Sequence, residues 1–240
     1  MPKYYSALAL LLLVLFQSSC KKDTEVLTCR LTSWQVSGQE FYYTYNSQGF
    51  VERMSVSSSS NYVVYTQSGN LLTSQGYDST GSAIGSPTVR QVNSEGYYSM
   101  IPNTSDTTFL TYNGAGQLLT YARRNDTLIN HTTFTYENGD LVKTVSLKSD
   151  SSISSIGTYD YYTDRVNTSN LNISFDLLEP RYGKPSRHLM KSSTTSNSSG
   201  DIDFRNFYYE FDENGNAISL QLITQPGNTI TDLKFGYRCE

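Results

Sequence analysis

One short motif recurs along the 240-residue chain and constrains its fold more than any other feature. Two aromatic or apolar residues separated by one position are followed by Asn, Asp or Glu, a short turn, a Gly and an apolar pair. The acidic or amide side chain can accept hydrogen bonds from the turn, and the Gly can adopt the positive φ of a hairpin corner. Each copy therefore predicts a β-hairpin. The clear copies span 43–51, 110–119, 134–142 and 209–218, and degenerate ones surround Gly69, Gly81 and Gly96.

The segments between these turns alternate in polarity, as strands with one buried face do. For example, Thr132, Phe134 and Tyr136 alternate with His131, Thr133 and Thr135. The copies recur about every 20 residues, which accommodates two strands and their turns. A further copy that lacks Gly is expected at 159–166. The sequence thus predicts an all-β fold, an antiparallel β-meander of repeated hairpins that forms one domain over 27–240 and is rolled into a soluble barrel or half-barrel.

A membrane-spanning barrel is the alternative to a soluble one. Such a barrel needs an outward apolar band about 25 Å tall. Polar strand faces that carry Arg30, Glu137, Lys234 and Arg238 argue against this band.

The first 19 residues have the features of a secretory signal peptide. Lys3 supplies a positive start, and the apolar run from Leu8 to Phe16 is too short to span a bilayer. Cys20 follows small residues and resembles the acylated Cys of the bacterial lipobox, which implies a lipidated N-terminus and a tether over 20–26. Lys21, Lys22 and Asp23 after it are similar to the export tag of surface lipoproteins in the Bacteroidota. A plain cleaved signal peptide is the alternative.

Two cysteines remain, Cys29 and Cys239, one near each end of the mature chain. In an oxidising compartment such a pair can form a disulfide. Both fall on the apolar face of their strands, and a bond requires Cα atoms within about 7 Å. A closed sheet would bring the first and last strands together in this way. Two buried free thiols are the alternative.

The repeated turn motif resembles the Tyr-Asp repeats of Rhs-type proteins. Most of 27–240 resembles the Bacteroidota lipoproteins that are classed as a domain of unknown function with a porin-like fold. The resemblance implies an extracytoplasmic β-meander rolled into a barrel or half-barrel. It implies no activity and transfers no catalytic residue to this chain.

Residues 179–191 interrupt the repeat with two prolines and a cluster of cations. One hypothesis is a loop that covers a mouth of the barrel and binds an anionic group such as a uronate, sulfate or phosphate. The candidate ligand-binding residues are Arg181, Lys184, Arg187, His188 and Lys191. The alternative is a crossover with a short helix over 186–190 that plugs an open end.

Tyrosine supplies a second candidate binding surface, because aromatic rings can stack on sugars. Five tyrosines alternate with more hydrophobic neighbours and are expected to face outward: Tyr42, Tyr62, Tyr98, Tyr162 and Tyr208. Cross-strand tyrosine pairs also stabilise sheets without any ligand, which is the alternative interpretation.

Other chemistries find little support in the sequence. The net charge is −4, so we expect no nucleic-acid partner. His131 and His188 lack a suitably spaced third ligand, and the acidic turn at 212–216 fits the hairpin motif, so we expect no metal or other cofactor. No pair of carboxylates stands out as a glycosidase site.

The function predicted from these features is that of a noncatalytic lipoprotein of the outer membrane, held by its lipid anchor. We expect it to face the cell surface, with the periplasmic face as the alternative, and to bind a glycan or an envelope protein. An enzyme that acts on extracellular polysaccharide and a structural envelope component are the alternatives.

Overall fold

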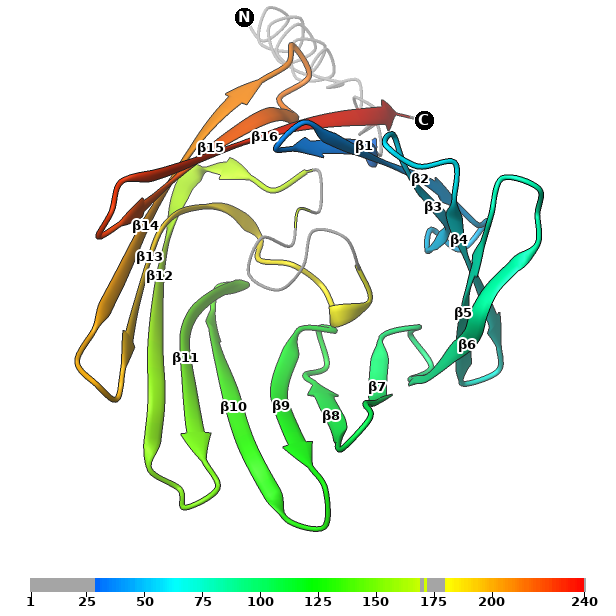
Figure 1. Cartoon of the computed structure of the whole chain (residues 1–240). Coiled ribbons are helices and arrows are strands. Elements are labelled where there is room, and N and C mark those ends of the chain that lie inside the picture. Colours follow the sequence, from blue (N-terminus) through cyan, green and yellow to red (C-terminus); the bar gives the residue numbers. More distant parts are fainter. Residues whose placement is uncertain (1–28, 169–170, 172–179, 240) are drawn as a thin grey trace, which may run out of the picture.

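The computed structural model describes residues 29–168, 171 and 180–239, which form a closed antiparallel barrel of 16 strands (Figure 1). Each strand pairs with the next one along the chain, and β16 closes the ring by pairing with β1. The strands are β1 (Cys29–Val36), β2 (Gln39–Tyr45), β3 (Val51–Val56), β4 (Tyr62–Ser68), β5 (Leu71–Tyr77), β6 (Ala83–Val92), β7 (Tyr98–Pro102), β8 (Thr107–Tyr112), β9 (Leu118–Arg124), β10 (Leu128–Glu137), β11 (Asp140–Lys148), β12 (Ile153–Val166), β13 (His188–Asn197), β14 (Ile202–Phe211), β15 (Ala217–Gln225) and β16 (Thr229–Cys239). The predicted meander is confirmed, and the barrel is complete rather than half-open.

The signal peptide, Cys20 and the tether lie outside the described residues. Among the residues that are described, no helix is long and apolar enough to cross a membrane.

The turns of the repeated motif contain the hydrogen bonds that were predicted for their Asn and Asp side chains. In the turn between β2 and β3, the Asn46 side-chain oxygen accepts hydrogen bonds from the backbone N–H groups of Gln48 and Phe50, both at 3.0 Å. The same arrangement recurs at Asn93, Asn113 and Asp212. The copy expected at 159–166 is wrong, because β12 continues unbroken through these residues. That segment lacks the Gly that is present in the clear copies of the motif.

The antiparallel order sorts the turns onto two ends of the barrel. One end, here called the terminal rim, holds the start of β1, the end of β16 and the turns that follow the even-numbered strands. The other end, the distal rim, holds the turns that follow the odd-numbered strands. Because chain entry and exit share the terminal rim, any N-terminal anchor attaches at that end.

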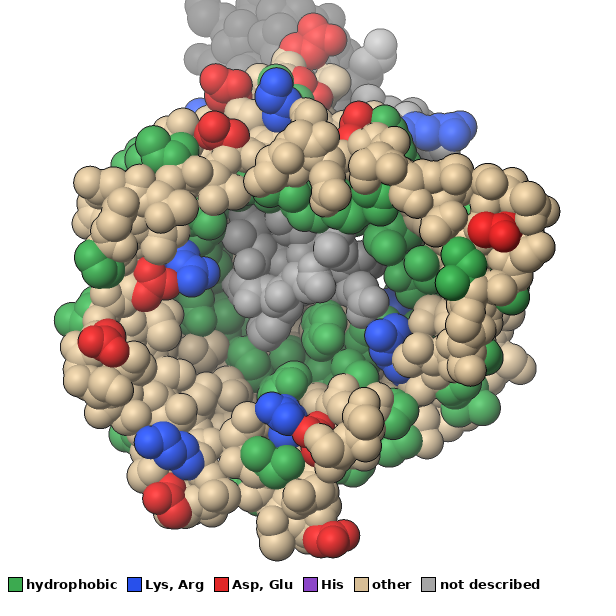
Figure 2. Space-filling view, viewed as in Figure 1, with side chains coloured by type: hydrophobic (Ala, Val, Ile, Leu, Met, Phe, Trp, Pro, Cys, Tyr) green, Lys and Arg blue, Asp and Glu red, His purple; other side chains and the backbone are tan. Residues whose placement is uncertain are grey.

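Inward side chains fill much of the barrel with two hydrophobic clusters. The larger one includes Trp34, Phe207 and Leu220, and the smaller one includes Leu72 and Tyr98. Tyr65 packs against both clusters and connects them. In Figure 2, hydrophobic side chains are visible along the inner side of the ring.

Residues 180–187, in the connection between β12 and β13, contact turns of the terminal rim, at that mouth of the barrel. These residues are here called the inner segment and begin with the 3₁₀ turn η1 (Pro180–Tyr182), drawn in yellow inside the ring in Figure 1. The Lys184 N–H donates to the Gly116 carbonyl at 2.8 Å, and the Arg187 N–H donates to the Gly139 carbonyl at 3.0 Å. The expected helix over 186–190 is wrong, because β13 begins at His188.

Glycine allows the closest approach of the inner segment to the rim. Gly183 has a φ of +98°, and a Cβ atom there would lie 2.8 Å from the Gly116 carbonyl oxygen. A larger residue would both strain the backbone and push the segment off the turn between β8 and β9.

Toward the distal rim the inner wall becomes polar. Arg205 and Asp203 form an ion pair at 2.7 Å, and the hydroxyls of Thr132 and Ser146 lie 2.9 Å apart. Arg123 forms an ion pair with Asp106, and its hydrogen bond to that carboxyl holds the Asp106 pKa below its usual value. The barrel is therefore apolar inside near the terminal rim and polar near the distal rim.

Cys29 and Cys239 lie directly opposite each other in the pairing of β1 with β16. Paired residues of an antiparallel ladder have Cα atoms about 4.5 to 5.5 Å apart, which is within the reach of a disulfide. The strand proximity required by the predicted disulfide is therefore present. The side chain of Cys239 lies outside the described part of the structure.

Candidate functional site

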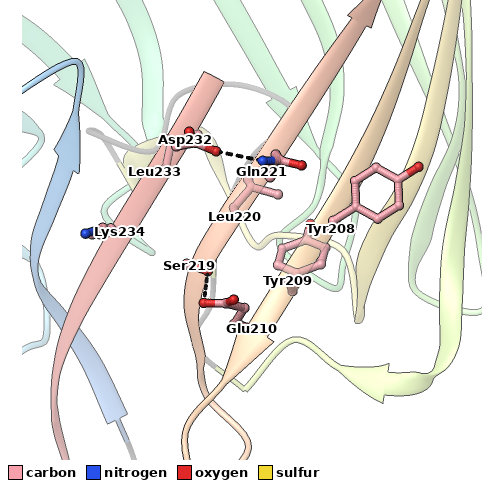
Figure 3. Close-up of a pocket in the computed structure, with 9 residues that line it drawn as sticks. All are labelled: Tyr208, Tyr209, Glu210, Ser219, Leu220, Gln221, Asp232, Leu233 and Lys234. Atoms are coloured by element: carbon pink, nitrogen blue, oxygen red, sulfur yellow. Dashed lines mark hydrogen bonds between the residues drawn. The ribbon is translucent and has the colours of Figure 1, made fainter. Parts of the chain in front are cut away.

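A groove of about 360 Å³ lies on the outer wall across β14, β15 and β16 (Figure 3). We call it the outer-wall groove. Nine residues line it: Tyr208, Tyr209, Glu210, Ser219, Leu220, Gln221, Asp232, Leu233 and Lys234. Six of them have polar or aromatic side chains at outward positions of the three strands, so the groove combines an aromatic ring with hydrogen-bonding groups.

Strand register arranges these six residues in two parallel rows. Tyr208 pairs with Gln221, and Gln221 pairs with Asp232, which gives the first row. The second row runs from Glu210 through Ser219 to Lys234. Neighbouring strands are about 4.8 Å apart and the rows about 7 Å apart, so the grid measures roughly 10 by 7 Å. This area matches one or two sugar rings.

A hydrogen bond holds two of the polar side chains in each row in place. The Gln221 amide donates to Asp232 at 3.1 Å, and the Ser219 hydroxyl donates to Glu210 at 2.9 Å (Figure 3). Each carboxylate keeps a second oxygen that can accept a hydrogen bond from a ligand hydroxyl. The side chains are thus oriented before a ligand arrives, which lowers the entropic cost of binding.

Tyr208 provides the apolar part of the groove. Its side chain is 49% exposed although it lies in the middle of a strand. A tyrosine ring on a sheet surface can stack on the apolar face of a sugar while its hydroxyl donates a hydrogen bond. By contrast, burial raises the pKa of the neighbouring Tyr209 well above its usual value, so this inward tyrosine stays neutral and structural.

The prediction that five tyrosines face outward is only partly correct. Tyr42 and Tyr208 are exposed, as expected. Tyr98 is fully buried, so its predicted outward position is wrong. It pairs with Val92 and belongs to the smaller core cluster, and the adjacent Tyr97 made the alternation ambiguous. Tyr162 is half-buried and donates a hydrogen bond to the Phe207 carbonyl at 3.0 Å.

The five candidate cationic residues do not converge on one site. Arg181 is buried inside the barrel, where its guanidinium donates to the Gly96 carbonyl at 3.0 Å and to Gln67 at 3.1 Å. Lys184 and Arg187 are exposed beside different turns of the terminal rim.

The remaining two candidates, His188 and Lys191, share an open cavity of about 480 Å³ with three carboxylates. These are Glu137, Asp140 and Asp160. His188 Nδ1 lies 2.7 Å from an Asp140 oxygen, and the backbone N–H of His188 donates to the other Asp140 oxygen at 2.8 Å. This acidic setting gives no support to anion binding there.

Sequence patterns indicated Tyr208 but not its partners in the groove. Glu210, Ser219, Gln221, Asp232 and Lys234 occupy alternate positions of three strands, which marks them as outward-facing. Their alignment into rows depends on register, which the separate segments do not encode. Within the described residues, no group of three His, Cys, Asp or Glu side chains is arranged to hold a metal.

Comparison with solved structures identifies related folds. A porin-like protein from Bacteroides uniformis aligns over 88% of this chain and 98% of its own, with a TM-score of 0.60 and 14% identity. A porin-like protein from Bacteroides vulgatus aligns over 87% and 98%, with a TM-score of 0.59 and 14% identity. The fold is similar to that of both proteins. No protein-family model matches the sequence, and no curated protein matches it.

Proposed function

We propose that this protein is a lipid-anchored barrel of the outer membrane that binds a glycan in its outer-wall groove without catalysing a reaction on it. The single observation that carries the binding role is the groove itself, an exposed tyrosine beside two rows of pre-oriented polar side chains. Cys20 carries the lipid in this proposal, and the barrel lies on the membrane, facing the cell surface.

The charged residues on the outer wall support the proposal that the barrel does not cross the membrane. Exposed charged residues occur at outward positions around the ring, including Arg53 on β3, Lys143 on β11, Asp160 on β12 and Asp232 on β16. A lysine or arginine on the lipid-facing side of a spanning barrel costs about 2 to 4 kcal/mol at the bilayer midplane. Such charges are compatible with an outer wall in water.

The geometry of the groove favours binding over hydrolysis. Glu210 and Asp232 lie on opposite corners of the grid, in different rows and two strands apart. The spacings of a sheet separate such positions by roughly 12 Å, whereas paired glycosidase carboxylates lie about 5 to 9.5 Å apart. The groove also lies on the outside of the barrel, where water surrounds a bound ligand.

We also propose that Cys29 and Cys239 form a disulfide. The two residues are paired in register where the ring closes, and an outer-membrane protein folds in an oxidising compartment. The bond would fasten the first and last strands of the barrel.

Replacing Tyr208 with Ala is expected to weaken glycan binding about tenfold, because the variant loses the stacking surface. The ligand would first be identified on an array of neutral oligosaccharides, and its affinity then measured by isothermal titration calorimetry. Tyr42→Ala is the matched control, since Tyr42 is similarly exposed on β2, away from the groove. Equal affinities for the Tyr208 and Tyr42 variants, or no glycan bound by the wild type, would refute the binding role.

A further inference from the structure

A second cavity, of about 380 Å³, opens on the outer wall at the terminal rim. We call it the arginine cleft. Its lining residues are Arg30, Thr32, Tyr43, Thr44, Tyr45, Asn46, Ser47 and Arg238. Two arginines are thus combined with three serine or threonine hydroxyl groups, two tyrosines and an amide, and none of these lining residues is acidic. The outer-wall groove, with two carboxylates, has the opposite character.

The ladder holds the two arginines side by side. Arg30 pairs with Arg238 across β1 and β16, one position from the pair formed by Cys29 and Cys239. Both arginines are exposed. A single anion at this position can contact both guanidinium groups at once.

The cleft also orients Arg30. Its guanidinium lies 6.0 Å from the centre of the Tyr45 ring, on the cavity side of β2. Burial raises the pKa of Tyr45 to about 12, so the ring remains neutral at physiological pH. The guanidinium also lies beside the turn that follows β2, because a Cβ atom at Gly49 would be in ordinary van der Waals contact with its terminal nitrogen, at 3.6 Å.

The remaining lining groups can donate hydrogen bonds to an oxyanion. The side-chain oxygen of Asn46 already accepts from Gln48 and Phe50, which leaves its amide NH₂ group as the donor. Thr32, Thr44 and Ser47 contribute hydroxyl groups. Planar guanidinium groups bind phosphate through two parallel hydrogen bonds, so a pair of them suits a single phosphate group.

The position of the cleft indicates where that phosphate would come from. Arg30 lies in the first strand at the rim where the chain enters the barrel, and eight residues lie between Cys20 and Cys29. A stretch of this length spans at most about 30 Å. We infer that the arginine cleft binds the phosphate of a membrane-lipid headgroup and so fixes the barrel's orientation beside the bilayer. This inference rests on the lipid anchor of the proposed function.

The test uses the full chain with Cys20→Ser, so that no acyl chain contributes to binding. Its affinity would be measured by cosedimentation with phosphatidylcholine vesicles that contain or lack phosphatidylglycerol. Arg30→Gln and Arg238→Gln are each expected to weaken binding to the anionic vesicles about fivefold, and the double variant about 25-fold. Arg124→Gln is the matched control, because it removes one exposed arginine at the distal rim. Circular dichroism would verify that every variant is folded.

The outcomes separate the membrane headgroup from other sources of phosphate. Equal vesicle binding by the double variant and Arg124→Gln would overturn the inference. Binding of inorganic phosphate that depends on both arginines, with vesicle binding unchanged, would assign the cleft to a soluble phosphate and also overturn it. Because the assay uses unlipidated protein, its result does not depend on whether Cys20 carries a lipid, which cell fractionation of the wild type tests separately.

Discussion

Replacing Cys29 or Cys239 with Ser is expected to lower the free energy of unfolding by about 5 kcal/mol. The predicted bond closes a loop of roughly 200 residues, and cross-linking so long a loop removes much of the conformational entropy of the unfolded chain. The two residues already face each other where the ring of strands closes. Losing the bond would therefore make the barrel easier to open along the seam between β1 and β16.

Urea denaturation of the Cys20→Ser protein, with and without a reducing agent, measures this contribution. The reductant should lower the stability of this protein by the same amount as Cys29→Ser does, and should not affect Cys29→Ser further. Two alkylatable thiols in the unreduced protein, together with identical unfolding curves, would show that the cysteines are free.

Replacing Arg181 with Met is expected to lower the free energy of unfolding by about 3 kcal/mol. Arg181 is only 4% exposed, and its removal takes a hydrogen-bond donor away from the Gly96 carbonyl and from the Gln67 amide oxygen. Each buried acceptor left unsatisfied costs about 1 to 3 kcal/mol. The guanidinium also lies 4.4 Å from the centre of the Phe50 ring, a contact that methionine replaces only in part.

Lys184→Met is the matched control for Arg181→Met. Lys184 belongs to the same inner segment, but its side chain is exposed and its bond to Gly116 comes from the backbone. Its replacement should change stability by at most about 0.5 kcal/mol. Hydrogen exchange at the Lys184 and Arg187 amides should become faster in Arg181→Met only. Equal stability of the two variants would show that Arg181 does not hold the inner segment in place.

The local turn chemistry made most of the fold predictable. An Asn or Asp that accepts two turn amides, followed by a Gly with positive φ, specifies a hairpin from only a few residues. Repetition of such hairpins leads to a meander, and the closure of the ring agrees with the strand phases of Cys29 and Cys239. The prediction failed at 159–166, where aromatic spacing was present without the Gly that makes the corner.

The interior of the barrel could not be predicted in the same way. Arg181 contacts Gly96, which is 85 residues away in sequence, so no local pattern shows that this cation is buried. A cluster of cations close in sequence therefore suggested one binding loop, whereas the structure distributes these residues between the interior, the rim and β13. The outer-wall groove and the arginine cleft likewise depend on which residues the ladder places opposite each other.

Cell fractionation of Cys20→Ser tests most directly whether this barrel is attached to the membrane only by lipid. The wild type should fractionate with the outer membrane and carry a diacylglyceryl modification detectable by mass spectrometry. The variant should be recovered without detergent, with a β-sheet circular-dichroism spectrum and cooperative unfolding. A folded variant that stays in the membrane fraction and requires detergent for extraction would contradict this, because the strands themselves would then be crossing the bilayer.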